Sequence, residues 1–290
     1  MIISASRRTD IPAFYSPWFM DKVKRSYCEV ANPFNPHQVQ KIDLSPEKVS
    51  LFVFWTKNPE PLLPQLEQLD NRGYRYFFLY TLNPYSSDLE PTVPRLKKRI
   101  KTLQQLAGLI GADKVIWRYD PLIITSRMNS NYHQEKFAQL AGQLKGYTRQ
   151  IIISFFSPYS RAQKRLQQAG INPLDPQEIE PWRKEFLAEL ARIGADNDME
   201  VAGCAQEDLE RTGVKVGKCI DEKYIARIWG LKVAGTRDKG QRPTCGCINS
   251  TDIGYYNSCQ HQCLYCYARG SRERVDREVS RHRICSPSLL

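Results

Sequence analysis

Three cysteines near the C-terminus have the spacing of ligands to an iron–sulfur cluster with one open iron. Cys259, Cys263 and Cys266 form a C-x3-C-x2-C run. Three thiolates can bind three corners of a four-iron cube and leave the fourth iron open to a substrate or cofactor. Structural zinc sites need four ligands, usually in C-x2-C pairs or with histidines, and this run contains only His261 in addition. The spacing and the soft ligands therefore favour an open iron–sulfur site over a zinc site or a set of packed thiols.

The run, with Tyr265 before its last cysteine, resembles the signature of the radical S-adenosylmethionine (SAM) enzymes. In that superfamily SAM binds the open iron, and an electron from the cluster cleaves it to a 5'-deoxyadenosyl radical. The resemblance implies a [4Fe-4S] cluster, bound SAM and a reducing partner such as flavodoxin or ferredoxin. The motif usually follows the first strand of a βα barrel, so its place at the end of this chain implies a circular permutation.

A wider pattern covers nearly the full length of the chain. It comprises Ser-Arg-Arg-Thr-Asp-Ile-Pro at 6–12, Phe-Trp-Thr-Lys-Asn-Pro at 54–59 and Trp-Arg-Tyr-Asp-Pro at 117–121, together with the C-terminal cysteines. This pattern resembles a bacterial and archaeal family catalogued as a domain of unknown function. The resemblance supplies no substrate.

Four further cysteines form a second candidate set of metal ligands, namely Cys204, Cys219, Cys245 and Cys247. The N-terminal residues lack the apolar region of a signal peptide, so we expect a cytoplasmic protein with reduced thiols and no disulfide framework. Four thiolates can close every corner of a second [4Fe-4S] cluster or form a zinc site. We expect iron–sulfur, because one assembly pathway could fill both sites, and zinc stays the alternative. Cys28 and Cys285 are expected to bind no metal.

Six short apolar runs, rich in β-branched and aromatic residues, predict parallel strands buried on both faces. They are Ile2–Ser4, Leu51–Trp55, Tyr76–Leu82, Val115–Arg118, Ile151–Phe155 and Met199–Ala202. Helical patterns lie between them, around 16–27, 60–72, 92–110, 132–145, 160–169 and 178–195. This alternation predicts an α/β fold.

We expect a partial or complete TIM-type βα barrel, with an open doubly wound sheet as the alternative. Residues 1–203 would form the barrel core, and the cysteine-rich residues 204–290 would bind iron–sulfur and complete the barrel. In the permuted order, Asp252–Tyr256 would be the strand that leads into the cysteine run. Ile2–Ser4 would be the next strand, and the tail after Cys266 would hold the helix between them.

Polar residues at the ends of the predicted strands would meet at the mouth of such a barrel. The candidates for catalysis are Arg7, Arg8, Asp10, Lys57, Arg118 and Asp120. Guanidinium groups can bind a carboxylate or phosphate, and Asp10 a ribose hydroxyl or an ammonium group. Ser4 and Asn58 join Tyr265 as candidates for cofactor contacts, because the Gly-Gly-Glu-like segment of many radical SAM proteins is not found. The alternative is that the charged residues form ion pairs that fix loops.

The chain is basic, with a net charge of +11 and a pI near 9.2. Such an excess favours an anionic partner such as nucleic acid, although other basic proteins bind no polyanion. No apolar stretch reaches the roughly 18 residues that span a bilayer, so we expect no membrane partner. We therefore expect a radical SAM enzyme with an unknown, anionic or nucleic-acid substrate. The alternative is a non-catalytic, zinc-stabilised protein that binds nucleic acid.

Overall fold

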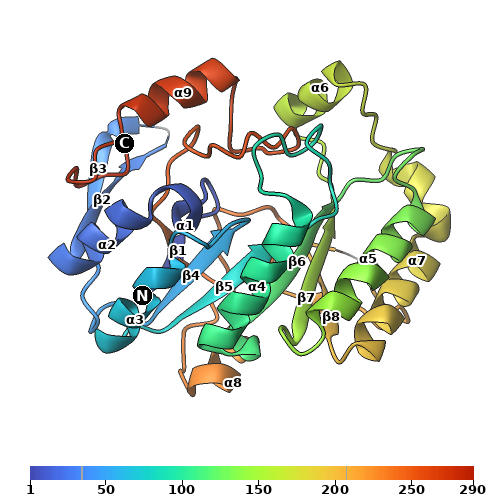
Figure 1. The fold of residues 1–290 in the computed structure, drawn as a ribbon, viewed down its shortest axis with the longest axis horizontal. Helices are drawn as coiled ribbons and strands as arrows, with labels where there is room; N and C mark the ends of the chain where they lie inside the picture. Colours follow the sequence, from blue (N-terminus) through green and yellow to red (C-terminus); the bar gives the residue numbers. More distant parts are fainter. Residues whose placement is uncertain (34, 207) are drawn as a thin grey trace. The chain divides into compact units, whose positions relative to one another are not determined.

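A computed structural model describes residues 1–33, 35–206 and 208–290. The described chain forms two compact units (Figure 1). The first unit contains residues 1–80, 86–94 and 250–290, and the second contains residues 81–85 and 95–249. The first unit is therefore assembled from both ends of the chain.

Four parallel strands form the centre of the first unit, in the order β10-β1-β4-β5. They are β1 (Ile2–Ala5), β4 (Leu51–Thr56), β5 (Tyr76–Thr81) and the short β10 (Thr251–Asp252). The helical elements of this unit are α1 (Ile11–Phe14), α2 (Ser16–Arg25), the 3-10 helix η1 (Leu63–Gln65), α3 (Leu66–Asn71) and α9 (Arg272–Ser280). Connections through helices are what parallel strands require.

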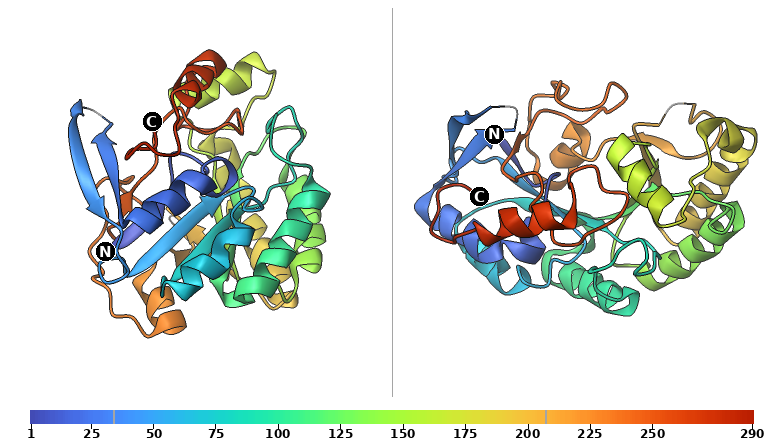
Figure 2. Two further views of the ribbon diagram at one scale, coloured as in Figure 1. Left: turned by 60° about the vertical axis from the view of Figure 1, so that its left-hand side comes forward. Right: turned by 90° about the horizontal axis from the view of Figure 1, so that it is seen from above.

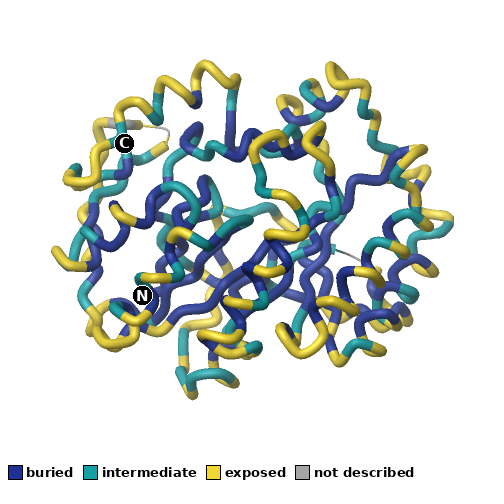
Figure 3. Tube along the Cα trace, viewed as in Figure 1, coloured by how far each residue is buried: buried dark blue, intermediate teal, exposed yellow. Residues whose placement is uncertain are grey.

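The strands β4 and β5 are buried along their whole length (Figure 3). Their sequences, LFVFWT and YFFLYT, are almost continuously apolar, as strands covered on both faces must be. Phe54 stacks on Phe78 at 4.8 Å between ring centroids and meets the edge of Phe19 at 5.3 Å. Burying each such ring contributes roughly 1.5–3 kcal/mol to folding. These aromatic contacts form the core of the first unit.

An antiparallel hairpin and the C-terminal residues complete the first unit. The hairpin consists of β2 (Tyr27–Asn32) and β3 (Asn35–Asp43). The last residues of the chain lie beside it, where Glu29 forms a bridge with Ser288 (Figure 2). Trp18 donates its indole N–H to the carbonyls of Ser286 and Ser288, both at 3.1 Å. The C-terminal residues are thereby attached to the buried face of α2.

The second unit contains four further parallel strands, in the order β6-β7-β8-β9. They are β6 (Val115–Leu122), β7 (Gln150–Phe155), β8 (Glu200–Cys204) and β9 (Lys215–Gly217). Its helices are α4 (Leu96–Ile110), η2 (Ala112–Lys114), α5 (Ser130–Leu144), α6 (Ser160–Gln168), α7 (Pro176–Asp196) and α8 (Glu222–Trp229). The longest helix, α7, begins at a capping box in which Asp175 and Glu178 satisfy each other's backbone N–H groups.

The fold confirms the predicted α/β class. The six apolar runs correspond to the strands β1 and β4–β8. The predicted helices are confirmed as α2, α3 with η1, and α4–α7, and the expected tail helix is α9. A strand does precede the cysteine run, but β10 covers only Thr251–Asp252 and not the expected Asp252–Tyr256; it pairs with β1 through Ile3–Thr251 and Ser4–Asp252. Among the described residues, the strand pairings do not close a ring. None of the described helices is long and apolar enough to cross a membrane.

Candidate functional site: two cysteine centres

The C-x3-C-x2-C run lies in the first unit, on a loop between β10 and α9. Hydrogen bonds from two separate segments hold this loop. The Tyr15 hydroxyl, at the start of α2, donates to the Ser258 carbonyl at 2.6 Å. The Thr92 hydroxyl donates to the Gln260 carbonyl at 2.5 Å. The backbone on both sides of Cys259 is therefore fixed by side chains that are distant in sequence.

Asp252, the last residue of β10, ties the start of this loop to the end of β1. Its carboxylate accepts hydrogen bonds from the Ser4 hydroxyl at 3.0 Å, the Ser6 hydroxyl at 2.5 Å and the Arg7 backbone N–H at 2.8 Å. At Gly254 a Cβ atom would lie only 2.0 Å from the Ser6 hydroxyl oxygen, so a side chain there would push the two segments apart. Ser4, a candidate for cofactor contact, makes a structural hydrogen bond in this arrangement.

Asp10 joins α1, the end of β4 and the cysteine loop. One carboxylate oxygen caps α1 by accepting from the Ala13 N–H at 3.0 Å. The other accepts from the Lys57 backbone N–H at 2.7 Å and lies 2.8 Å from His261 Nε2. An ionised carboxylate only accepts, so the His261 Nε2–H donates to Asp10 and Nδ1 is the other ring nitrogen. That Nδ1 is buried and has no hydrogen-bond partner among the described residues.

Glu90 is buried beside the cysteine loop and was missed by the sequence analysis. Its carboxylate lies 2.8 Å from the Lys57 ammonium group and accepts a hydrogen bond from the Tyr265 hydroxyl. The side chain of Glu90 is 1% exposed and that of Lys57 is 11% exposed. The Lys57 ammonium also lies 5.5 Å from the centre of the Tyr265 ring. Glu90 does not follow a strand, so no pattern in the sequence marked it.

Burial and charge control the three thiols of the run. Burial raises the pKa of Cys259 well above its usual value and that of Cys263 to about 12, and nearby Lys57 opposes the rise at Cys263. Burial lowers the pKa of Arg269, and the three cysteines oppose this change. The Arg269 guanidinium donates to the Cys263 carbonyl at 3.0 Å. Two cations therefore lie where thiolates would need them once a metal displaces the thiol protons.

The sulfur positions in the run differ from those of a single-ion site. Among the described residues, only one group of three or more potential ligands has all its atoms within 4.8 Å of one another, and it does not include this run. A four-iron cube binds each thiolate to a separate iron and so keeps the sulfurs farther apart than one ion does. The three sulfurs of the run therefore do not converge as the ligands of one ion would.

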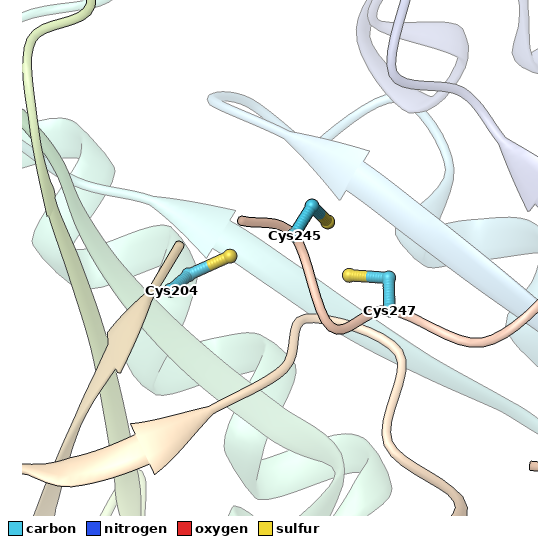
Figure 4. A group of neighbouring side chains, drawn as sticks. All are labelled: Cys204, Cys245 and Cys247. Atoms are coloured by element: carbon cyan, nitrogen blue, oxygen red, sulfur yellow. The ribbon is translucent and has the colours of Figure 1, made fainter. Parts of the chain in front are cut away.

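The group with closely spaced sulfurs lies in the second unit and consists of Cys204, Cys245 and Cys247. Figure 4 shows these three side chains turned toward a common space. The Cys219 sulfur lies 3.5 Å from the Cys204 sulfur. All four residues are buried, and no disulfide joins them. Hydrogen bonds among the thiols, together with burial, raise the pKa of Cys204 well above its usual value.

The segments that carry these four cysteines are held by backbone contacts. Arg237 donates to the carbonyls of Cys245 and Arg242, both at 3.0 Å. The N–H of Asp238 donates to the Cys247 carbonyl at 2.9 Å. These hydrogen bonds fix the backbone of the loop around Cys245 and Cys247.

Arg118 and Asp120, which were candidates for catalysis, also belong to the second unit. They form an ion pair with each other, and Asp120 accepts a hydrogen bond from Ser154. Arg118 further contacts the Thr81 hydroxyl at 3.4 Å. The arrangement matches the alternative of a structural ion pair at least as well as a substrate contact.

The other candidates lie in the first unit with Asp10 and Lys57. Arg7 donates to the Ser250 hydroxyl at 3.1 Å and lies 5.0 Å from the centre of the Trp55 ring. Arg8 lies 5.1 Å from the centre of the Tyr256 ring. Asn58 donates its backbone N–H to the Thr56 hydroxyl at 2.9 Å. Outside both cysteine centres, Cys28 is buried in β2 and Cys285 is exposed.

Residues 2–268 match the family described as "Domain of unknown function (DUF1848)". The match covers nearly the whole chain, so the protein belongs to this family. Searches of curated proteins and of solved structures found no match.

Proposed function

We propose that this DUF1848 protein is a radical SAM enzyme with a [4Fe-4S] cluster on Cys259, Cys263 and Cys266. The observation that carries the proposal is the parallel pairing of β10 with β1. It makes the strand before the cysteine loop a neighbour of the N-terminal strand, as a circularly permuted radical SAM βα barrel requires. Three thiolates on this loop leave one iron of a cube for SAM.

The surroundings of the loop support an anionic cluster. Thiolates and cluster together carry negative charge, and the buried groups Lys57 and Arg269 offset it where water is excluded. His261 is held by Asp10 and does not compete for a place among the thiols. When bound, the cluster and SAM would supply a 5'-deoxyadenosyl radical that abstracts a hydrogen atom from the substrate.

The protein's own groups position the loop and exclude water from it. Asp252 fixes the start of the loop against β1. Asp10 caps α1 and binds His261, which fixes the loop between Cys259 and Cys263. Glu90 holds the Tyr265 hydroxyl, which sets the ring beside Cys266 in one orientation. Rigid placement of this kind is what brings a reactive group and its target within contact distance. Shielding from water prevents side reactions of a reactive intermediate.

The net charge of the protein is the feature that bears on the substrate. The net charge of +11 supports an anionic molecule, with nucleic acid among the candidates. A flavodoxin or ferredoxin in the cytoplasm would supply the electron. Arg7 and Arg8, at the end of β1, are the groups proposed to contact the anion, because guanidinium forks match carboxylates and phosphates.

The test is anaerobic reconstitution with iron and sulfide, followed by reduction and addition of SAM. We expect visible sulfide-to-iron absorption, SAM binding by equilibrium dialysis, and slow release of 5'-deoxyadenosine without substrate. The matched control is Cys285→Ala, which removes an exposed cysteine outside both centres. A fully loaded protein that fails to bind SAM would overturn the proposal.

A further inference from the structure

Three cysteines of the second unit bring their sulfurs as close together as the ligands of one ion, and the sulfur of a fourth, Cys219, lies beside that of Cys204. In a tetrahedral zinc site with bonds of about 2.3 Å, neighbouring sulfurs lie about 3.8 Å apart. The sulfurs of Cys204 and Cys219 are 3.5 Å apart, and those of Cys204, Cys245 and Cys247 all lie within 4.8 Å of one another. A four-iron cube would hold the same sulfurs farther apart, since each binds a different iron.

From this spacing we propose that Cys204, Cys219, Cys245 and Cys247 bind one zinc ion in a closed structural site. The inference replaces the expected second iron–sulfur cluster and is independent of the proposed SAM chemistry. Four thiolates fill all positions of a tetrahedral ion, so neither water nor substrate has a place on it. The four side chains are 2–7% exposed, which agrees with a site that exchanges nothing with solvent.

The surrounding charges suit a tetrathiolate. Zinc with four thiolates carries a net charge of about −2, which a buried site must offset. The hydrogen bond with Cys204 and the nearby positive charge of Arg118 both lower the pKa of Cys219, against the larger combined rise caused by Cys247 and burial. The Arg237 side chain is bound to the Cys245 carbonyl. These two guanidinium groups support the site without ligating the metal.

The ion would join three segments that have little other regular structure. Cys204 ends β8, Cys219 lies between β9 and α8, and Cys245 and Cys247 lie on the irregular loop that follows α8. Among described residues 218–249, α8 is the only helix or strand. A structural metal contributes folding free energy directly in such a segment, because no preformed site exists in the unfolded chain.

The experiment uses the full chain with Cys259, Cys263 and Cys266 all changed to alanine, which removes the other centre. After purification from medium that contains both iron and zinc, metal analysis should give about one zinc per chain and no acid-labile sulfide. Replacing the zinc with cobalt should give the strong thiolate-to-cobalt absorption of a tetrahedral site with four sulfur ligands. Iron with sulfide, mononuclear iron, or no metal would each overturn the inference.

Alanine variants of these ligands carry the risk of misfolding, so a ligand exchange provides the second measurement. Cys219→His keeps four ligands of a kind that zinc accepts. We expect this variant to retain about one metal per chain and to shift the cobalt bands to shorter wavelength, since an imidazole replaces a thiolate. Cys28→Ala is the matched control, because it removes a buried cysteine outside the site. Unchanged cobalt bands in Cys219→His would remove Cys219 from the ligand set.

Discussion

The two cysteine centres differ in how far apart their cysteines lie in the sequence and in how close their sulfurs lie in the structure. In the first unit three cysteines lie within one short loop, yet their sulfurs do not form a closely spaced group. In the second unit four cysteines are scattered from Cys204 to Cys247, yet the sulfurs of three converge and that of Cys219 lies 3.5 Å from the Cys204 sulfur. Short spacing in the sequence thus accompanies the proposed open cluster site, and long spacing accompanies the proposed single-ion site. The number of ligands and the distances between their sulfurs, more than sequence spacing, are what distinguish the two proposals.

The largest expected effect comes from changing Cys259, Cys263 and Cys266 together to alanine. We expect the reconstituted variant to lose about four irons per chain, its visible absorption and all release of 5'-deoxyadenosine, because the cube has no ligands left. Its zinc content should stay unchanged. Iron and zinc are measured by elemental analysis on the same sample, with Cys285→Ala as the control. Retention of iron would assign the cluster to other residues.

The second effect concerns stability. Cys204→Ala should lower the melting temperature by roughly 10 °C, since losing a structural metal removes several kcal/mol and a unit of this size shifts by about 2–4 °C per kcal/mol. Cys28→Ala should cost far less, because it removes one buried sulfur and no metal. Calorimetry and zinc analysis together decide the point. Equal effects of the two variants would show that the second centre is a set of packed thiols.

The buried ion pair of the first unit gives the third prediction. Glu90→Gln leaves the Lys57 ammonium without its charged partner, and breaking one side of a buried pair costs about 3–5 kcal/mol. Adding Lys57→Met to Glu90→Gln should restore part of that loss in denaturant unfolding. The control is Lys215→Met, which removes an exposed ion pair with Glu200 and should cost less than about 1 kcal/mol. No recovery in the double variant would mean that the two charges are not coupled.

The smallest predicted effect depends on pH and concerns the second unit. His133 is buried between the Tyr119 hydroxyl and the Ile123 carbonyl, and burial lowers its pKa to about 4. The unfolded chain takes up this proton near its usual pKa of about 6.5, so stability falls by about 3 kcal/mol as pH drops from about 6.5 to 4.

The comparison that tests this effect is His133→Gln against the unchanged protein. The glutamine amide can still donate and accept but does not titrate in this range. Unfolding free energy measured at several pH values should therefore fall less steeply for the variant. Protonation of the metal-binding thiols affects both proteins and cancels in the difference. Parallel slopes for the two proteins would remove His133 from the acid response.

The buried strands were predictable because each is a continuous apolar run, and β4 and β5 are the clearest examples. The hairpin β2–β3 was not, because its described residues are mostly exposed or half-buried and give no apolar pattern. The proposed ligands of the first centre were chosen on spacing alone and stay a prediction. Glu90 and the Asp252 hydrogen bonds could not, since their partners are brought together only by the fold. The closely spaced sulfurs of the second centre likewise depend on backbone paths that spacing does not specify.

The assembly of the first unit from both ends of the chain has a consequence during protein synthesis. The second unit is complete once Asn249 has been made, but the first lacks β10, the cysteine loop and α9 until the last residues are made. Residues 95–249 separate the N-terminal and C-terminal parts of the first unit, and at 5–20 residues per second these 155 residues take roughly 8–30 s to make. During that interval β1 lacks its neighbour β10. The loop of the proposed iron–sulfur cluster is therefore made last, after all four ligands of the proposed zinc site.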